Sequence, residues 1–151
     1  MNSFNWQNFL QKHPLFSSLD EEEVASLLKG EVSQERTYPQ GIAILREGEV
    51  GDSLFLIRSG SAQVTLRGTG GPFTQLATLQ AGDIFGEMAV LERRPRSATV
   101  VAMEDCLLLE IAGEAIRKLL EVHPEMQVKL YTIARDRMRH WFHSLGSGGP
   151  H

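Results

Sequence analysis

Cysteine is almost absent from this chain of 151 residues, which contains only Cys106. One thiol can form neither an internal disulfide nor a four-thiolate iron–sulfur site. It lies in the apolar stretch Cys106-Leu107-Leu108-Leu109, which favours a buried cysteine in a strand. A disulfide-stabilised scaffold is therefore excluded, and the length suits one domain built around a hydrophobic core.

Long apolar runs and an excess of basic residues are missing as well. No run approaches the roughly 18 residues that a membrane-spanning helix needs, and residues 1–7 lack the basic and apolar regions of a secretory signal. The formal net charge is −4, which disfavours nucleic acid as a partner because phosphate backbones recruit basic surfaces. We therefore expect a cytoplasmic protein that by itself binds neither membrane nor nucleic acid.

Histidine is missing from the middle of the chain. The five histidines lie at positions His13, His123, His140, His143 and His151. A β-barrel metalloenzyme of the cupin kind needs clustered histidines on its strands, so this class of enzyme is excluded. No nucleophile is placed in a pattern with a base, and we expect no enzymatic activity, no metal and no cofactor.

Short apolar or alternating runs fill residues 32–111, and turns containing glycine separate them. Many short strands at this spacing indicate a sandwich or a barrel. The runs that read as strands are 42–45, 53–58, 62–66, 73–79, 98–102 and 106–111.

Helical patterns flank this strand region. Asp20 stands where an N-cap is expected, and the three glutamates that follow suit the dipole of a helix. Further helices are predicted at 86–92, 115–122 and 125–145, before a glycine-rich flexible tail at 146–151. The prediction is one domain, 1–145, made of N-terminal helices (1–31), a strand region (32–111) and C-terminal helices (112–145).

The segment from Phe85 to Thr99 carries the chemistry. Gly86 lets the backbone approach a ligand closely, and the N–H groups of the short helix after it favour an anion. Arg96 is a planar cation that suits a phosphate, and Glu87 accepts hydrogen bonds, as a sugar hydroxyl requires. A ligand with a phosphodiester and a free ribose hydroxyl satisfies all of these groups together.

This segment resembles the phosphate-binding cassette of cyclic-nucleotide-binding domains, which occur in bacterial catabolite-activator-type regulators, regulatory subunits of protein kinase A and cyclic-nucleotide-gated channels. The family pattern is Phe-Gly-Glu-Leu-Ala, a variable stretch, then Arg-(Ala/Ser/Thr)-Ala-(Thr/Ser). The chain matches it with Met88 in place of the leucine. The resemblance implies an eight-stranded jelly-roll β-barrel, or β-roll, that contains the short phosphate-binding helix and is flanked by N-terminal helices and two C-terminal helices.

The resemblance also implies roles for single residues. Glu87 would bind the ribose 2′-hydroxyl and Arg96 the cyclic phosphate. Backbone N–H groups complete the phosphate site near Gly86, Met88, Ala89 and Ser97. By strand register, Val64 and Leu76 are predicted to face the base or the ribose, and plain core packing is the alternative for both.

In this family the last helix folds over the base as a lid, and the candidate lid residues here are Arg137, Met138 and Trp141. An apolar seam on this helix has heptad spacing at Tyr131, Ala134, Met138, Trp141 and Leu145. The seam packs either against its own barrel or against a second copy, which makes a homodimer an open alternative.

The expected function is a sensor of cyclic AMP, or else of cyclic GMP, that signals to an effector by closure of the C-terminal helix. Ser97 follows Arg96. In the family, alanine at this position accompanies a preference for cyclic AMP and threonine a preference for cyclic GMP, and serine is intermediate between the two. The alternative is a ligand-sensing fragment of a larger transcription regulator, channel, transporter or kinase, and the sequence does not name the effector.

Overall fold

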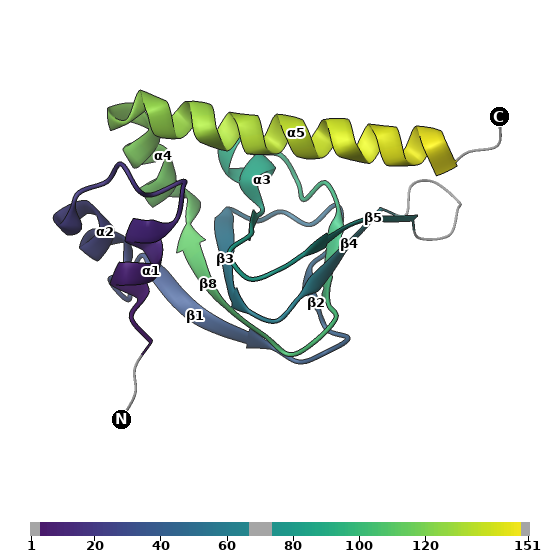
Figure 1. Ribbon diagram of the computed structural model, residues 1–151, viewed down its shortest axis with the longest axis horizontal. Helices are drawn as coiled ribbons and strands as arrows, with labels where there is room; N and C mark the ends of the chain where they lie inside the picture. Colours follow the sequence, from purple (N-terminus) through teal and green to yellow (C-terminus); the bar gives the residue numbers. More distant parts are fainter. Residues whose placement is uncertain (1–3, 67–73, 149–151) are drawn as a thin grey trace.

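The computed structural model describes residues 4–66 and 74–148, with side chains described as far as His140 except that of Thr74. Eight strands in these ranges form two antiparallel sheets of four strands, and the two N-terminal helices and the first C-terminal helix gather at one end (Figure 1). The first sheet has the order β1 (Ser33–Tyr38), β8 (Cys106–Ala112), β3 (Ser53–Ser59), β6 (Ile84–Phe85). The second has the order β2 (Ala43–Leu45), β7 (Thr99–Ala102), β4 (Ala62–Leu66), β5 (Thr74–Leu79). The predicted mainly-β fold with eight strands is confirmed, although the strands pair as two sheets and not as one closed barrel.

Strand β3 has both of its faces buried, and it separates two hydrophobic clusters. Leu54 and Leu56 point to the helices, while Phe55 and Ile57 point between the two sheets. Successive side chains of a strand alternate in this way, so a strand covered on both sides reads as a continuous apolar run. Phe55 stacks on Phe85 of β6 with ring centroids 5.0 Å apart, which fixes the strand that leads into the predicted cassette.

Two strands were not among the six predicted runs. Strand β1 has the sequence Ser-Gln-Glu-Arg-Thr-Tyr, of which only Ser33 is buried. Its position comes from backbone pairing with β8, from Ser33 opposite Ile111 to Tyr38 opposite Cys106. Strand β6 has only two residues. Hydrophobic alternation cannot reveal either strand, because β1 has few apolar residues and β6 is too short to show a pattern.

Five helices complete the described part of the chain: α1 (Trp6–Lys12), α2 (Glu21–Leu27), α3 (Glu87–Glu92), α4 (Gly113–Val122) and α5 (Pro124–Gly148). The predicted N-cap of α2 is confirmed. The Asp20 side chain accepts from the Glu23 N–H at 2.8 Å, and the Glu23 side chain accepts from the Asp20 N–H at 3.0 Å. This reciprocal pair is a capping box, which satisfies two N–H groups that the helix itself leaves free.

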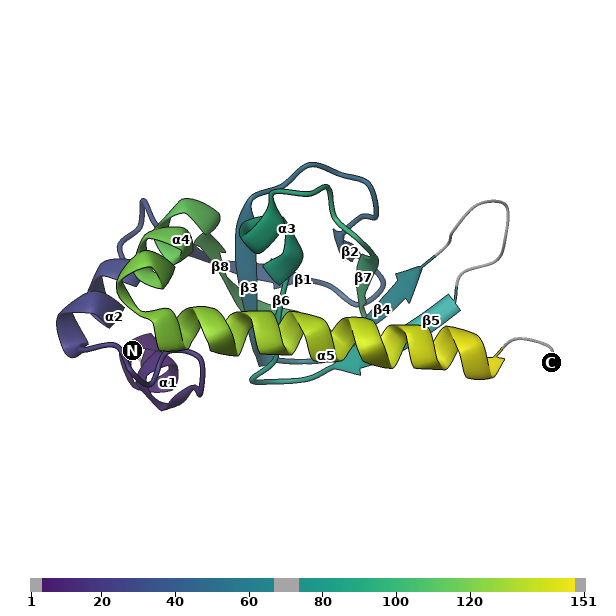
Figure 2. The ribbon, with the colours of Figure 1, turned by 90° about the horizontal axis from the view of Figure 1, so that it is seen from above.

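Helix α5 runs along one side of the molecule, over α3 and past the strands of the second sheet (Figures 1 and 2). It extends to Gly148, so residues 146–148 of the expected tail are helical, and residues 149–151 lie outside the described residues. Extension of an existing helix needs no new nucleus, which explains why the helix continues beyond the predicted end. Within the described ranges, no helix has the length and apolar character needed to span a membrane.

Two histidines attach the N-terminal helices to the remainder of the molecule. The Leu15 N–H donates to Nδ1 of His13 at 3.1 Å, so Nε2 carries the proton and donates to the Gly82 carbonyl at 2.7 Å. Burial lowers the pKa of His13, which keeps this ring neutral. His123 lies 2.5 Å from Glu23 of α2, and this hydrogen bond raises the pKa of His123.

Candidate ligand-binding site

One cavity collects all six residues predicted for the ligand. Its volume is about 40 Å³, and it lies between α3, the second sheet and α5. The predicted residues on its wall are Gly86, Glu87, Met88, Ala89, Arg96 and Ser97. Apolar side chains and one further arginine line the remainder, namely Leu45, Val64, Ala77, Leu79, Phe85, Ala98, Val100 and Arg137. The site therefore has a polar end formed by the cassette and an apolar end formed by the strands.

Arg96 is buried, with 7% of its surface exposed. Its guanidinium donates to the Ser53 carbonyl at 3.2 Å, to the Ser53 hydroxyl at 3.2 Å and to the Gly86 carbonyl at 3.5 Å. All three acceptors are neutral, and no carboxylate of the described residues lies within 4.0 Å of this guanidinium. Burial lowers the pKa of Arg96, so the group is held in the fold as a cation without a close counter-charge.

Ser53 holds Arg96 through a chain of polar contacts across the first sheet. Its hydroxyl donates to Glu110 of β8 at 2.7 Å and accepts from Arg96. The other oxygen of Glu110 accepts from Arg36 of β1 at 2.9 Å. The position of the guanidinium is therefore fixed by contacts through the three neighbouring strands β3, β8 and β1, and not only by its own loop.

Two glycines leave room for this guanidinium. A Cβ atom at Gly51 would lie 2.7 Å from Nη2 of Arg96, and a Cβ atom at Gly86 would lie 3.0 Å from Nη1. Gly86 also has a φ of 86°, in the left-handed region that favours glycine, at the turn that leads into α3. A side chain at Gly51 would therefore displace the guanidinium, whereas one at Gly86 would also meet the Ser53 carbonyl at 2.9 Å.

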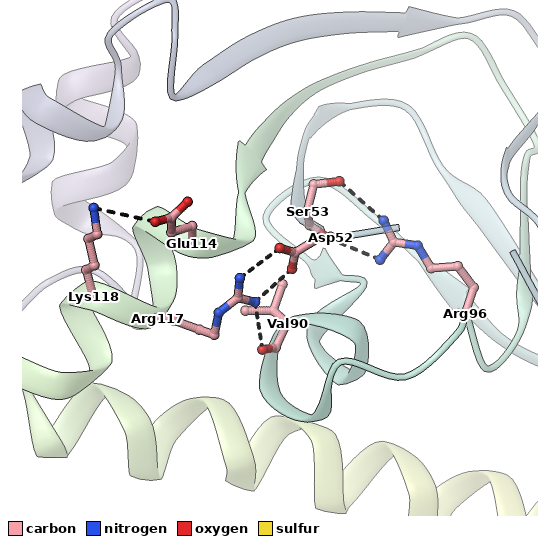
Figure 3. Close-up of polar contacts among 7 residues, drawn as sticks. All are labelled: Asp52, Ser53, Val90, Arg96, Glu114, Arg117 and Lys118. Atoms are coloured by element: carbon pink, nitrogen blue, oxygen red, sulfur yellow. Dashed lines mark hydrogen bonds and ion pairs between the residues drawn. The ribbon is translucent and has the colours of Figure 1, made fainter. Parts of the chain in front are cut away.

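Asp52 and Ser53 point to opposite sides, as Figure 3 shows. Arg117 of α4 donates to both oxygens of Asp52, each at 2.7 Å, and also to the Val90 carbonyl of α3 at 3.2 Å. Arg117 lowers the pKa of Asp52. Arg117 therefore connects three segments, namely the start of β3, α3 and α4.

Glu87 is also buried, with 6% exposed, and its partner comes from α5. Oε1 of Glu87 accepts a hydrogen bond from Nη1 of Arg137, and Nη2 of the same arginine donates to the carbonyl of Ile84. No contact of Oε2 appears among the described residues. Helix α5 is therefore connected to the cassette through the side chain that the sequence predicted for the ribose.

The residues predicted near the base are placed differently. Val64 lines the cavity, whereas Leu76 does not, and Ala77 stands there opposite Val64. Val64 pairs with Ala77 and Thr65 pairs with Gln75, so Leu76 is the extra residue of a β-bulge. A bulge turns a side chain away from the alternation expected for the strand. Leu76 packs in the cluster between the sheets, as its core-packing alternative predicted.

The three candidate lid residues also differ. Arg137 lines the cavity, as described above, and Met138 is half-buried but not on the wall. Trp141 belongs to α5, but its side chain lies outside the described part of the structure. Of the two candidates whose side chains are described, the structure thus brings Arg137 to the site and not Met138.

Sequence analysis missed the residues that position Arg96, chiefly Gly51 and Ser53. Both belong to a stretch that sequence analysis divides between a glycine-bearing turn and the next strand. A glycine followed by polar residues occurs in many turns, so the pattern holds no specific signal for a phosphate site. Arg117 carried no signal either, because a single arginine on an amphipathic helix is an ordinary surface residue.

Known proteins share this fold and this segment. The family model described as "Cyclic nucleotide-binding domain" matches residues 35–123. The "Cyclic AMP receptor protein" of Thermus thermophilus is 37% identical over 126 residues, which cover 83% of this chain and 57% of that protein. The "cAMP-dependent protein kinase regulatory subunit" of Aspergillus niger is 34% identical over 115 residues, which cover 76% of this chain and 27% of that protein. Among solved structures, the regulatory domain of Toxoplasma gondii PKA with cAMP has a TM-score of 0.76 and 27% identity, covering 87% of this chain and 49% of that one.

The chain spans less than two thirds of the length of these relatives. The match from residue 35 to residue 123 nevertheless includes the cassette, Arg96 and the Asp52–Arg117 pair, and it covers more than half of the chain. It confirms the family that the cassette resembles: this chain belongs to the cyclic nucleotide-binding domain family.

Proposed function

We propose that this chain binds cyclic AMP in the cassette cavity, does no chemistry on it, and reports it to an effector through α5. One observation carries this proposal, namely the buried guanidinium of Arg96 with neutral acceptors only. A buried cation costs free energy unless an anion accompanies it. A cyclic phosphate would supply that anion, and the planar guanidinium matches phosphate oxygens well.

Glu87 supports a ribose as the second part of the ligand. Arg137 donates to Oε1 and orients the carboxylate, which leaves Oε2 to accept from a 2′-hydroxyl. The apolar wall from Val64, Ala77 and Val100 suits the flat face of a base. Phosphate, sugar and base thus meet different parts of one cavity.

Cyclic AMP is favoured over cyclic GMP as the main ligand. The names of the two relatives and of the solved structure described above all specify cyclic AMP. Ser97 carries a hydroxyl, which is the group that would contact guanine in relatives with a preference for cyclic GMP. We therefore expect cyclic GMP to bind at the same site with lower affinity.

Helix α5 is proposed to be the moving part. A cavity of about 40 Å³ is much smaller than the roughly 300–1,000 Å³ of small-molecule sites, so a nucleotide needs a shift of this wall. The hydrogen bond from Arg137 to Glu87 connects α5 to the ligand site, so a ligand that changes the contacts of Glu87 would shift α5. A ligand can bias a conformation only through different contacts in the two states, and this ion pair offers that difference.

The effector is proposed to be a separate protein or another part of a longer chain, such as a transcription regulator, channel, transporter or kinase. Tyr131 of the predicted heptad seam is 43% exposed and leaves a short apolar strip on α5, so pairing with a second copy through this seam is included in the proposal. The strip is narrow, and such pairing should be weak.

Calorimetric titration tests the binding. Cyclic AMP should bind at one site per chain, cyclic GMP more weakly, and 2′-deoxy cyclic AMP about 5-fold to 100-fold more weakly, because Glu87 would lose a partner worth about 1–3 kcal/mol. Glu87→Gln should reduce the difference between the ribose and deoxyribose ligands. No heat with any of them at millimolar concentration would falsify the proposal.

Hydrogen exchange tests the movement of α5 separately. Amides of residues 135–145 should exchange more slowly at saturating cyclic AMP, while those of β3 and β8 should change less. Unchanged exchange in this part of α5, in a protein that binds the nucleotide, would refute the lid and leave the binding site intact.

A further inference from the structure

A second and larger hollow lies on the opposite side of α5 from α3. It is a groove of about 970 Å³ between α1, the turn after α1, the loop at 82–84 and the N-terminal half of α5. In Figure 2, α1 lies on one side of α5 and α3 on the other. The groove is therefore distinct from the cassette cavity, and Arg137 is the residue that lines both.

The walls of this groove are mainly apolar. Phe9 and Ile133 are partly buried and pack on the core, and Ile84 is fully buried behind them. Val128 stands on the rim with 65% of its surface exposed. An apolar hollow of this size open to solvent is uncommon on a protein surface and marks a binding site more often than a neutral surface.

The charges on the groove are mostly positive, although the chain has a net charge of −4. Lys12, Lys129 and Arg137 line it together with one carboxylate, Asp83. Arg137 is held by Glu87, Lys129 donates to the Pro14 carbonyl at 2.9 Å, and the pKa of His13 is lowered by burial, so that ring adds no charge. The Asp83 carboxylate accepts from the Gln80 N–H at 2.8 Å.

Lys12 differs from the other two cations of the groove. It is exposed, and no side-chain partner of Lys12 appears in the described ranges. The groove thus combines a long apolar wall with one ammonium that is free to pair with an anion. This complementarity specifies an occupant with an apolar body and a single negative head.

We propose that this groove binds a small amphipathic anion, an acyl-chain carboxylate, with its chain along Phe9 and Ile133 and its head beside Lys12. The volume lies within the roughly 300–1,000 Å³ of small-molecule sites. A second copy of this chain is the less favourable occupant. A two-fold interface would bring the same positively charged groove against itself, and like charges oppose such a contact. The proposal does not depend on the binding of a nucleotide.

Methyl NMR of isoleucine-labelled protein with decanoate tests this site. The methyl signals of Ile133 and Ile84 should shift and saturate, while that of Ile57, between the two sheets, should not. Decyltrimethylammonium has a similar chain and the opposite charge, and it should bind at least about tenfold more weakly.

Two variants and one control define the contacts. Lys12→Gln should weaken decanoate binding about twofold to fivefold, the scale of one exposed ion pair. Val128→Asp should weaken it about tenfold or more, because it places a negative charge on the rim. Lys29→Gln removes the same charge from an exposed lysine outside the groove, and it should change nothing.

Three results would overturn the proposal. The first is the absence of saturable shifts at Ile133 and Ile84. The second is equal binding of decanoate and decyltrimethylammonium, which would remove the role of Lys12. The third is a concentration-dependent dimer in sedimentation that Val128→Asp abolishes, which would assign the groove to a second copy of the chain.

Discussion

Asp52 and Ser53 are neighbours in the sequence, yet the arginines they hold are in opposite electrostatic situations (Figure 3). Arg117 has a carboxylate partner with two hydrogen bonds of 2.7 Å, whereas the more buried Arg96 has only neutral oxygens. Ordinary folding physics would give the deeper cation the counter-charge. This reversal supports the proposal that Arg96 binds an anion from outside the chain, and it suits a structural role for Arg117.

The same difference separates what the two arginines stabilise. Arg117 of α4 connects Asp52, the residue before β3, with Val90 of α3, so its loss should lower the stability of the folded state. Arg96 adds hydrogen bonds to Ser53 and Gly86 but carries a desolvation cost. These two contributions oppose each other, so loss of Arg96 should change the stability of the fold little and should mainly weaken ligand binding. Four experiments test this difference between Arg96 and Arg117.

The largest effect is expected for Arg96→Ala. Removal of the cation that is proposed to bind the phosphate should cost about 2–5 kcal/mol of nucleotide binding, about 30-fold or more in affinity. The midpoint of thermal unfolding without ligand should change little. Calorimetric titration and thermal unfolding measure the two quantities, and unaltered affinity would assign the phosphate to another group.

A smaller effect is expected for Gly51→Ala. The added methyl would lie 2.7 Å from Nη2 of Arg96, so the guanidinium must move away from Ser53. Nucleotide affinity should fall about tenfold, by about 1.4 kcal/mol, while Arg96 itself is still present. Gly30→Ala is the matched control, because no heavy atom lies within 4 Å of that added methyl. Equal affinities of the two variants would show that the position of the guanidinium does not matter.

Arg117→Ala should have the opposite profile. The free energy of unfolding should fall by about 1 kcal/mol, measured by urea denaturation, and nucleotide affinity should stay within about threefold. A double-mutant cycle with Asp52→Ala isolates the pair. Lys118→Ala, which breaks an exposed pair with Glu114 on the same helix, should change stability by less than about 0.5 kcal/mol. If Arg117→Ala abolished binding and left stability unchanged, the assignment of the two arginines would be reversed.

The smallest effect concerns pH. Since Arg117 lowers the pKa of Asp52, the stability from this pair is present above the unfolded-state pKa of about 4 and is lost as pH falls through the lower folded-state pKa. The stability difference between the native protein and Asp52→Asn should therefore be constant from pH 7 to about pH 5 and shrink below about pH 4. Urea denaturation across this range measures the difference, and growth of that difference in acid would contradict the lowered pKa.

The sequence allowed the cassette and the class of fold to be predicted because both depend on local patterns. Gly86, Glu87 and Arg96 lie in one short stretch, and the apolar run of β3 can be read from its own residues. Strand β1 could not be found in this way, since its position depends on pairing with β8 from the other end of the roll. Hydrophobic alternation indicates which residues of a strand are buried, and only the first residue of β1 is buried.

The contacts that the sequence did not reveal join distant residues. Ser53 reaches Arg96 across 43 positions, and Arg137 reaches Glu87 across 50. Strand register made Leu76 a candidate for the cavity wall, with core packing as the alternative, and a β-bulge turns Leu76 away from that wall. The groove beside α5 had no motif at all, because it is formed by side chains of three separated segments.

The pairing of β1 with β8 has a consequence for how the chain folds as it is synthesised. The two strands are the first and the last of the roll, so the first sheet cannot assemble until the whole region between them has left the ribosome. Contacts between residues so far apart in the sequence make folding slow. Until β8 is available, the edge of β1 is unpaired. An unpaired edge invites other chains, and charged residues discourage them. Glu35 and Arg36 stand in the middle of this strand, so the polarity that hides β1 from pattern analysis also protects the nascent chain from aggregation.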